Sequence, residues 1–387
     1  MSYFRQMIFF LVGVCVLSKQ GFASVQPDQN FTIWLEQTMK QKHVPGVSIA
    51  VIKNDHIEWA QGFGVVDTQT RQAVTTNTLF EAGSISKPVT AMAALKTVQT
   101  NKLQLDKNIN DYLISWQVPE NQFTKTEKVT LRRLLDHSAG ITVHGFAGYQ
   151  RGTSLPTLLE VLNGVSPANS APIRVAAVPG SKFQYSGGGY TIIQQVLIDT
   201  YHQPFPELMN QLVLQPLGMK QSTFEQPLPA SLLPLIAQPY TPGGVLPGGP
   251  HTYVAEAAAG LWSTPLDLAK FVISIQESIH GVNNEVLSPS FAKLMVSPAI
   301  NNEMGLGLEI GVNKYGKNAE QGSYFMHMGE DDGYQSVIIG DTKSGNGLVV
   351  MMNMFPDLNL ILQHKTADDT SLIYAIIQHV ADEEKWQ

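Results

Sequence analysis

The spacing of apolar residues predicts a helix followed by a β-hairpin near the start of the chain. Apolar residues recur at helical spacing over residues 31–41, at Phe31, Trp34, Leu35 and Met39. Gly46–Ile52 is then a β-branched run, and a second such run covers Ile57–Val66. Because the turn-forming pair Asn54-Asp55 separates the two runs, we expect two antiparallel strands.

Four further apolar runs near the other end of the chain also predict strands: Glu309–Val312, Ser323–His327, Ser336–Gly340 and Gly347–Met352. A helix is expected to close the chain over about Asp369–Asp382. Between the two ends, the sequence is rich in proline and glycine and predicts short helices at Tyr190–Tyr201 and Phe205–Leu214. The whole pattern predicts an α+β fold, in which helices flank an antiparallel sheet and a helical lobe is inserted. The sheet lobe would comprise about residues 24–95 and 255–387, and the helical lobe about residues 96–254.

The first residues have the composition of a secretory signal peptide. Arg5 precedes the apolar run Met7–Leu17, and small residues follow at Gly21-Phe22-Ala23. We therefore expect residues 1–23 to be removed after Ala23 and the protein to be exported, to the bacterial periplasm or to the medium. Cys15 is the only cysteine and lies inside this segment, so the mature chain would hold no disulfide.

Composition and charge limit the partners of the mature chain. A hydrophobic content of 43% in 387 residues fits a soluble globular protein, and no second segment is predicted to span a membrane. Loss of the two basic residues in the signal would lower the net charge from −7 to −9. An acidic protein of this kind is not an obvious nucleic-acid binder. The sequence leaves the oligomeric state open.

The candidate chemistry begins at Ser84-Ile85-Ser86-Lys87. On a helix, residues i and i+3 are neighbours, so the Ser84 hydroxyl and the Lys87 amine would face one spot. A serine becomes a nucleophile only when a nearby base takes its proton, and a lysine can be that base. The same pattern at Ser290–Lys293 follows Pro289, which suits the first turn of an ordinary surface helix.

Three later segments accompany Ser84 in a fixed order: Leu131–Ile141, Pro179–Tyr190 and His327–Gly329. With them, the chain resembles the serine β-lactamase and penicillin-binding-protein superfamily. It is most similar to the branch that contains class C β-lactamases, D-alanyl-D-alanine carboxypeptidases and related esterases. Ser84 and Lys87 match the Ser-x-x-Lys of that family, Tyr185 matches the tyrosine of its Tyr-x-Asn, and His327-Met328-Gly329 matches its Lys-Thr-Gly strand. The resemblance implies the β-lactamase/transpeptidase-like fold, with the site between the two lobes.

The resemblance also implies a role for each matched residue. Ser84 would attack a carbonyl and form an acyl-enzyme. Lys87 and Tyr185 would move the protons, in a division of labour that the sequence does not fix. The backbone N–H groups of Ser84 and Glu330 would form the oxyanion hole. Gly187, His327 and Gly329 would lie on the substrate side of the cleft.

Two departures from the family pattern bear on the substrate. The asparagine of Tyr-x-Asn is Gly187 here, so a side-chain amide that would contact an acylamino group is missing. Gly329 is followed by Glu330-Asp331-Asp332, which would lie just past the strand that receives the carboxylate of a β-lactam. Like charges repel, so these acids would disfavour anionic substrates.

Other kinds of chemistry have weaker support. The ten histidines form no His-x-x-x-His or His-x-His pair, and we expect no metal and no cofactor. Asp136-His137-Ser138 are adjacent in sequence, whereas triad partners meet in space, so we interpret them as a cap after a helix.

The sequence therefore predicts an exported serine hydrolase that acts on ester or peptide-like small molecules, including D-amino-acid or β-lactam-like ones. A class C-like β-lactamase and a D-alanyl-D-alanine carboxypeptidase are the nearest alternatives. A non-catalytic penicillin-binding-like scaffold protein is a third, for which Gly187 would be a mark of decay.

Overall fold

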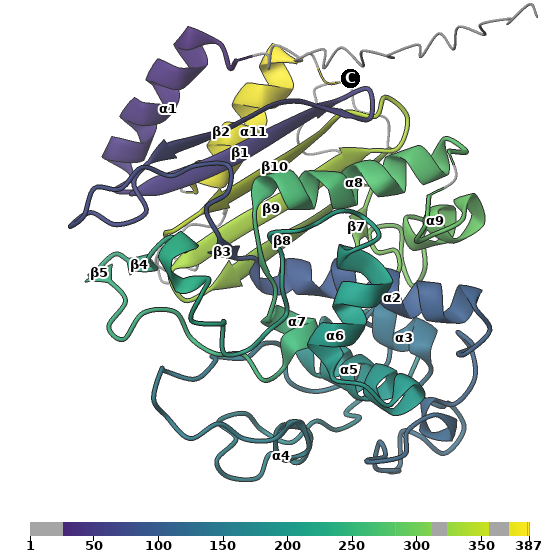
Figure 1. Ribbon diagram of the computed structural model, residues 1–387. Coiled ribbons are helices and arrows are strands. Elements are labelled where there is room, and N and C mark those ends of the chain that lie inside the picture. The colour runs from purple at the N-terminus through teal and green to yellow at the C-terminus, as the bar shows by residue number, and fades with distance from the viewer. Residues whose placement is uncertain (1–25, 283, 312–322, 356–370, 385, 387) are drawn as a thin grey trace, which may run out of the picture.

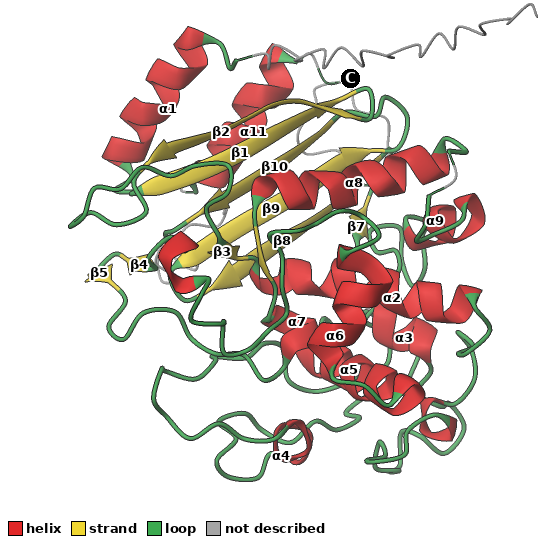
Figure 2. Cartoon of the chain, viewed as in Figure 1, coloured by secondary structure: helices red, strands yellow, loops and turns green. Residues whose placement is uncertain are grey.

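A computed structural model describes residues 26–282, 284–311, 323–355, 371–384 and 386, which form one antiparallel main sheet with helices on both faces (Figures 1 and 2). In this part of the chain the six strands of the sheet lie in the order β2-β1-β10-β9-β8-β7. Their bounds are β1 Gly46–Lys53, β2 His56–Gly64, β7 Glu309–Ile310, β8 Tyr324–Asp331, β9 Tyr334–Asp341 and β10 Gly347–Met352. The sheet thus joins strands from both ends of the sequence, and the predicted α+β class is confirmed.

Both faces of the sheet are buried, which explains the continuous apolar runs of its strands. In β1, Val47, Ile49 and Val51 enter one hydrophobic core, whereas Ala50 and Ile52 enter the other. The first core is covered by α1 (Gln29–Gln41) and α11 (Leu372–Glu383), which contact each other. On the opposite face α8 (Pro265–Ile279) packs across β1, β9 and β10 (Figure 1).

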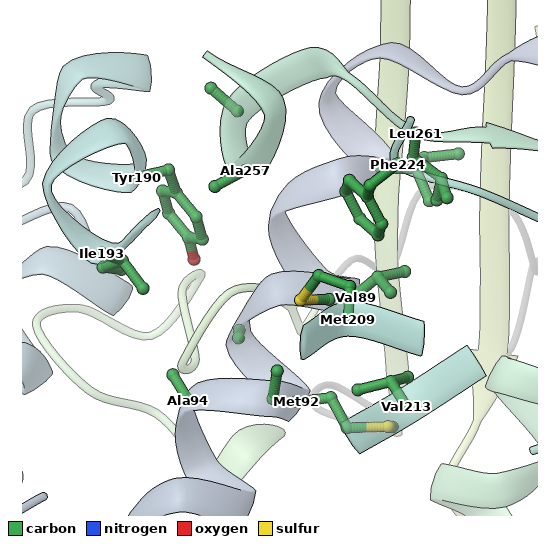
Figure 3. Close-up of a cluster of buried hydrophobic side chains, with 14 of the residues drawn as sticks. Val89, Met92, Ala94, Tyr190, Ile193, Met209, Val213, Phe224, Ala257 and Leu261 are labelled. Carbon is green, nitrogen blue, oxygen red and sulfur yellow. The ribbon is translucent and has the colours of Figure 1, made fainter. Parts of the chain in front are cut away.

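Helix α2 (Ser86–Gln99) is the centre of the helical side of the molecule. Eleven of its 14 residues are buried, and apolar residues occur all round it, as in a helix enclosed by protein. The helices α5 (Gly187–Tyr201) and α7 (Glu256–Ala259) pack against α2, as Figure 3 shows for Tyr190 and Ala257. The π-helical segment η3 (Asn210–Leu214) supplies Val213 to the same cluster.

The remaining described elements are short. The helices are α3 Leu131–Leu135, α4 Leu158–Asn163, α6 Phe205–Met209 and α9 Pro289–Met295, with 3₁₀ turns η1 Gly83–Ile85, η2 Ile109–Asp111 and η4 Leu233–Leu235. The strands are β3 Phe80–Glu81, β4 Tyr240–Thr241, β5 Gly244–Val245 and β6 Trp262–Ser263. β3 pairs with β6 and leads directly into η1, so this small ribbon brings the Ser84 turn to the sheet.

The structure differs from the sequence prediction at several element ends: for example, β2 and α5 span His56–Gly64 and Gly187–Tyr201 instead of the predicted Ile57–Val66 and Tyr190–Tyr201. β8 continues to Asp331, beyond the predicted end at His327, because Glu330 and Asp331 still pair with β9. The helix predicted over Phe205–Leu214 is α-helical only to Met209 and π-helical after it. The predicted ends at Val312 and Asp369, like the signal segment 1–23, lie outside the described residues.

Candidate active site

The turn that carries Ser84 depends on Gly83. Gly83 has φ of +52°, and a Cβ atom there would lie 2.6 Å from the backbone nitrogen of Glu330. Only glycine accepts both the left-handed backbone and this close approach. Ser86 fixes the turn from behind: its hydroxyl donates to the carbonyl of Gly83 (2.6 Å) and accepts from the N–H of Leu261 (2.9 Å). Ser84 therefore lies in the 3₁₀ turn η1, two residues before α2 begins at Ser86.

Lys87 lies behind Ser84 in the protein interior. Its side chain is only 2% exposed, and Nζ donates to Ser84 Oγ and to the carbonyl of Ala258, both at 2.8 Å. The amine is thus held in hydrogen-bond contact with the hydroxyl that it would activate. The structure places this pair as the i, i+3 spacing predicted.

Tyr185, from a distant part of the chain, completes a cluster of three side chains with Ser84 and Lys87. It lies just before α5, and its ring centroid is 5.1 Å from Lys87 Nζ. The rings of His137 and His144 pack on it, with centroids 4.4 Å and 4.8 Å away. Lys87 Nζ thus contacts the Ser84 hydroxyl and also lies over the ring of Tyr185.

His137 holds the segment that carries Tyr185. Its carbonyl accepts from the N–H of Gln184 (2.8 Å) and its Nδ1 from the N–H of Ser186 (3.1 Å), so both neighbours of Tyr185 are bonded to one residue. Burial, and secondarily the charge of Lys87, lowers the pKa of His137 well below its usual value. The imidazole is therefore neutral, with Nδ1 free to accept.

Asp136-His137-Ser138 was predicted to be only a cap after a helix, but His137 also positions Tyr185. Asp136 does cap the turn, since its carboxylate accepts from the N–H of Ser138 (3.0 Å). The position of His137 against Tyr185 was missed. No signal in the sequence marks it, because the contact spans almost fifty positions and depends on a left-handed residue at φ of +58°.

We expect His137→Phe to lower kcat by on the order of 10- to 100-fold, with a smaller change in KM, because small displacements of a catalytic group have large kinetic costs. Phenylalanine keeps a stacked ring but cannot accept from Ser186. His144→Phe is the matched variant, since it also keeps a ring on Tyr185 and no hydrogen bond from the His144 ring to the Tyr185 segment is found. Steady-state kinetics at equal folded fraction, checked by thermal melts, would test this. Equal losses in the two variants would contradict the positioning role.

The backbone of β8 approaches Ser84 at the edge of the sheet. β7 pairs only with Phe325 and Met326, so in the described chain no strand covers β8 beyond these residues on that side. The η1 turn packs there instead, and the Glu330 nitrogen lies against Gly83. The structure thus brings the N–H groups proposed for an oxyanion hole, those of Ser84 and Glu330, to one place.

His327 faces the same site from β8. Its side chain is 2% exposed, its ring centroid is 6.4 Å from that of Tyr185, and its Nδ1 contacts the carbonyl of Met328 at 2.6 Å. Burial, followed by the charge of Lys87, lowers the pKa of His327 to about 3. The neutral ring must donate from Nδ1 to Met328, so Nε2 presents a lone pair, and it has no partner in the described protein.

The two predicted glycines have structural roles. A Cβ at Gly187 would lie 3.1 Å from the carbonyl of His144 and 3.2 Å from the ring of Phe146, so these residues fill the space beside it. Gly329 packs directly against the carbonyl of Ala82. Neither glycine lines the pocket in front of Ser84, although both shape its wall.

That pocket has a volume of about 330 Å³ and lies between the sheet edge and the helices. Its lining comprises Ser84, Lys87, His144, Gly145, Phe146, Tyr185, Ala258, Ala259, Glu309, His327, Met328, Glu330 and Asp331. Three of these are acidic and one is a lysine, so carboxyl groups outnumber amines in the lining. Glu309 was missed, because it reaches the site only through the pairing of β7 with β8.

The acidic run Glu330-Asp331-Asp332 was predicted to lie just past the strand, but most of it belongs to the strand. Glu330 and Asp331 belong to β8, and Asp331 is buried beside Glu81. Burial raises the pKa of both Asp331 and Glu81, and their mutual proximity adds to the rise for Glu81. Asp332 instead turns away from the pocket and contacts His251 Nδ1 at 3.2 Å. Glu330 is therefore the exposed acid of the run that faces the pocket.

Two further features concern the described residues alone. Among them, no three histidine, cysteine, aspartate or glutamate side chains gather as metal ligands would. Within the same residues, none of the helices has both the length and the apolar character needed to cross a bilayer.

A serine hydroxyl bonded to a buried amine, with a tyrosine beside it and the backbone of β8 packed against the same turn, is an arrangement that suits a serine hydrolase. Comparison with known proteins agrees with this class. The family model described as Beta-lactamase matches residues 31–367, and the chain belongs to that family. The chain therefore belongs to the serine β-lactamase and penicillin-binding-protein superfamily and has its β-lactamase/transpeptidase-like fold, as the sequence predicted.

Individual relatives are distant. Protein flp of Staphylococcus aureus (strain MW2) is 25% identical over 324 residues, which is 83% of this chain and 62% of that protein. The chain thus spans about three fifths of the length of this curated relative. EstCE1, a hydrolase with promiscuous acyltransferase activity, superposes with a TM-score of 0.71 at 17% identity, over 91% of this chain and 97% of its own. D-amino acid amidase from Ochrobactrum anthropi SV3 superposes with a TM-score of 0.69 at 20% identity, over 92% of this chain and 98% of its own.

Proposed function

We propose that this protein is an exported serine hydrolase that forms an acyl-enzyme at Ser84 and acts on neutral or cationic esters and amides. The observation that carries the proposal is the 2.8 Å contact between Lys87 Nζ and Ser84 Oγ, in a buried position that opens to a pocket of small-molecule size. A non-catalytic scaffold would have no need of this contact, or of a tyrosine held beside it.

The geometry supports a two-step reaction. In the first step, Ser84 Oγ attacks the substrate carbonyl while its proton passes to Lys87 or, through Lys87, to Tyr185. The negative charge on the former carbonyl oxygen is held by the N–H groups of Ser84 and Glu330. Tyr185 then returns the proton to the leaving alcohol or amine. In the second step, the same groups activate a water that releases the acid from Ser84.

The proteins of similar structure and the shape of the pocket both bear on the substrate class. A hydrolase with acyltransferase activity and a D-amino acid amidase share the fold, so esters and amides of small acids are natural candidates. His144 and Phe146 occupy the space beside Gly187, which leaves no amide there for an acylamino side chain. A β-lactamase and a D-alanyl-D-alanine carboxypeptidase remain the alternatives, and both would have to bind a substrate carboxylate near Glu330.

We expect the enzyme to hydrolyse a neutral short-chain aryl ester with a higher kcat/KM than an anionic chromogenic cephalosporin. Glu330→Gln should raise kcat/KM for the cephalosporin by a few-fold to about tenfold, the range of a partly screened like-charge contact, and leave the ester unchanged. Asp332→Asn is the matched control, since Asp332 pairs with His251 and does not line the pocket. High salt should narrow the gap between the substrates. Efficient cephalosporin hydrolysis by the unmodified enzyme would favour a β-lactamase instead.

Export rests on the first 23 residues. A basic start, an apolar run and small residues at the exit are the three parts of a secretory signal. We expect the protein produced in a Gram-negative host to leave the cytoplasm and to begin near Ser24. Fractionation followed by amino-terminal sequencing would test this, and cytoplasmic protein that starts at Met1 or Ser2 would refute it.

A further inference from the structure

A buried hydroxyl, that of Ser336, lies at the junction between the η1 turn and the main sheet. Ser336 is on β9, directly opposite Gly329 of β8, and its side chain is fully buried. Its Oγ donates to the carbonyl of Ala82 at 2.9 Å, and the carbonyl of Gly329 lies at 3.5 Å from it. The hydroxyl therefore joins the segment that leads into η1 to the strand pair β8–β9.

The absence of a side chain at Gly329 makes room for this bond. Cross-strand partners project from the same face of a sheet, so a side chain at position 329 would share its space with that of Ser336. A Cβ atom at Gly329 would lie 2.5 Å from Ser336 Oγ and would also collide with the carbonyl of Ala82. Ser336 thus reaches Ala82 through the gap that the glycine leaves.

The carbonyl of Ala82 also closes the turn that carries the nucleophile. It accepts from the N–H of Ile85 at 3.1 Å, and this bond spans Ser84. The N–H of Ala82 donates to the carbonyl of Leu261 at 2.8 Å. A shift of Ala82 would therefore move the backbone of Ser84, and the bond from Ser336 holds this segment against the sheet.

The backbone N–H of Glu330 points from β8 toward the same turn. In an antiparallel strand, the N–H and C=O of one residue point to one side, and the side alternates from residue to residue. The carbonyl of Tyr324 accepts from Gly311, just past β7, so it points away from β9. Glu330 lies an even number of positions further along a register without shifts, and its nitrogen lies against Gly83. Its N–H therefore also points away from β9, toward η1.

We propose that Ser336 is a positioning residue of the oxyanion hole. Its bond to Ala82 fixes η1 against β8 and so sets the distance between the two N–H groups, those of Ser84 and Glu330. This inference rests on the proposed acyl-enzyme function. Ser336 does not line the pocket, so it acts only through the backbone that it holds. Because an oxyanion hole stabilises the developing negative oxygen, loss of the bond should lower kcat more than it changes KM.

Ser336→Ala tests the proposal when the hydrolysis of an ester and of its thionoester are compared. A thionoester carries sulfur in place of the carbonyl oxygen, and sulfur is a weak acceptor that depends less on N–H donors. With 4-nitrophenyl butanoate we expect kcat to fall about tenfold, which is less than the roughly 10²–10³-fold cost of deleting a donor. The matching O-aryl thionobutanoate should lose no more than about twofold, so the ester-to-thionoester ratio of kcat should fall about fivefold.

Ser278→Ala is the matched control. Ser278 is equally buried, and its Oγ donates to the carbonyl of Leu287 at 2.8 Å, outside the pocket. Both alanine variants lose one buried hydrogen bond and should melt at similarly lowered temperatures, but only Ser336→Ala should change the ratio. Ser336→Cys keeps a weaker donor and should give a smaller change, and it serves as the test if the alanine variant folds poorly.

Turnover is expressed per Ser84 labelled by a fluorophosphonate, so that only folded enzyme is counted. An unchanged ratio in the Ser336 variants, or an equal change in Ser278→Ala, would overturn the positioning role and leave the acyl-enzyme at Ser84 in place. Absence of labelling at Ser84 in the unmodified protein would instead refute the proposed function, and this inference with it.

Discussion

Ser84→Ala is expected to abolish covalent labelling by a fluorophosphonate and to lower kcat/KM for an aryl ester by on the order of 10³-fold or more. Ser84 Oγ is the atom that Lys87 contacts, and alanine at this position has no hydroxyl to form the ester bond of an acyl-enzyme. The fold should survive, because the turn is held by Gly83 and Ser86 rather than by the Ser84 hydroxyl.

Ser290→Ala is the matched control for this experiment. Ser290 lies in the second Ser-x-x-Lys of the sequence, but it is exposed on α9, and its hydroxyl contacts that of Ser288 at 3.1 Å. Intact mass spectrometry of labelled protein should show one adduct in the unmodified enzyme and in Ser290→Ala, and none in Ser84→Ala. An adduct that persists in Ser84→Ala would refute the assignment of the nucleophile.

Lys87 and Tyr185 are expected to lose function non-additively. Lys87→Ala and Tyr185→Phe should each lower kcat by on the order of 10²-fold or more, the usual contribution of general acid–base groups. The double variant should be little worse than the more damaging single one, because the two groups act in one proton-transfer path. The physical basis is that Lys87 Nζ contacts Ser84 Oγ and lies 5.1 Å from the Tyr185 ring.

The folding of these variants needs its own check, because Lys87 is buried. Its removal leaves the carbonyl of Ala258 without this donor, and a buried acceptor without a partner costs about 1–3 kcal/mol. Thermal melts and labelling of Ser84 would show whether the lysine variant retains the fold. Losses that multiply in the double variant, measured in folded protein, would contradict a shared path.

Part of the site could be predicted because it is local. Ser84 and Lys87 are three positions apart, and helical geometry alone brings them together. The strand around His327 was predictable from its apolar run, and the resemblance supplied Tyr185.

The rest depends on contacts between distant segments. His137 supports Tyr185 from almost fifty positions away in the sequence. Glu309 reaches the pocket through the pairing of β7 with β8. Glu81 and Asp331 are far apart in the sequence but lie close together in the fold. None of these pairs has a spacing that a periodic pattern could reveal. The acidic run shows the same limit: its three members are adjacent in sequence, yet Glu330 faces the pocket, Asp331 is buried and Asp332 bonds to His251.

The sequence by itself determined the class of fold, because period-2 and helical patterns specify the elements and the ordered motifs specify the family. It also determined the nucleophile and its amine as a local pair. Only the tertiary structure decided which carboxyl groups are buried and which imidazoles are neutral. These properties arise from burial and from distances between segments far apart in the chain, and both exist only after the chain has folded.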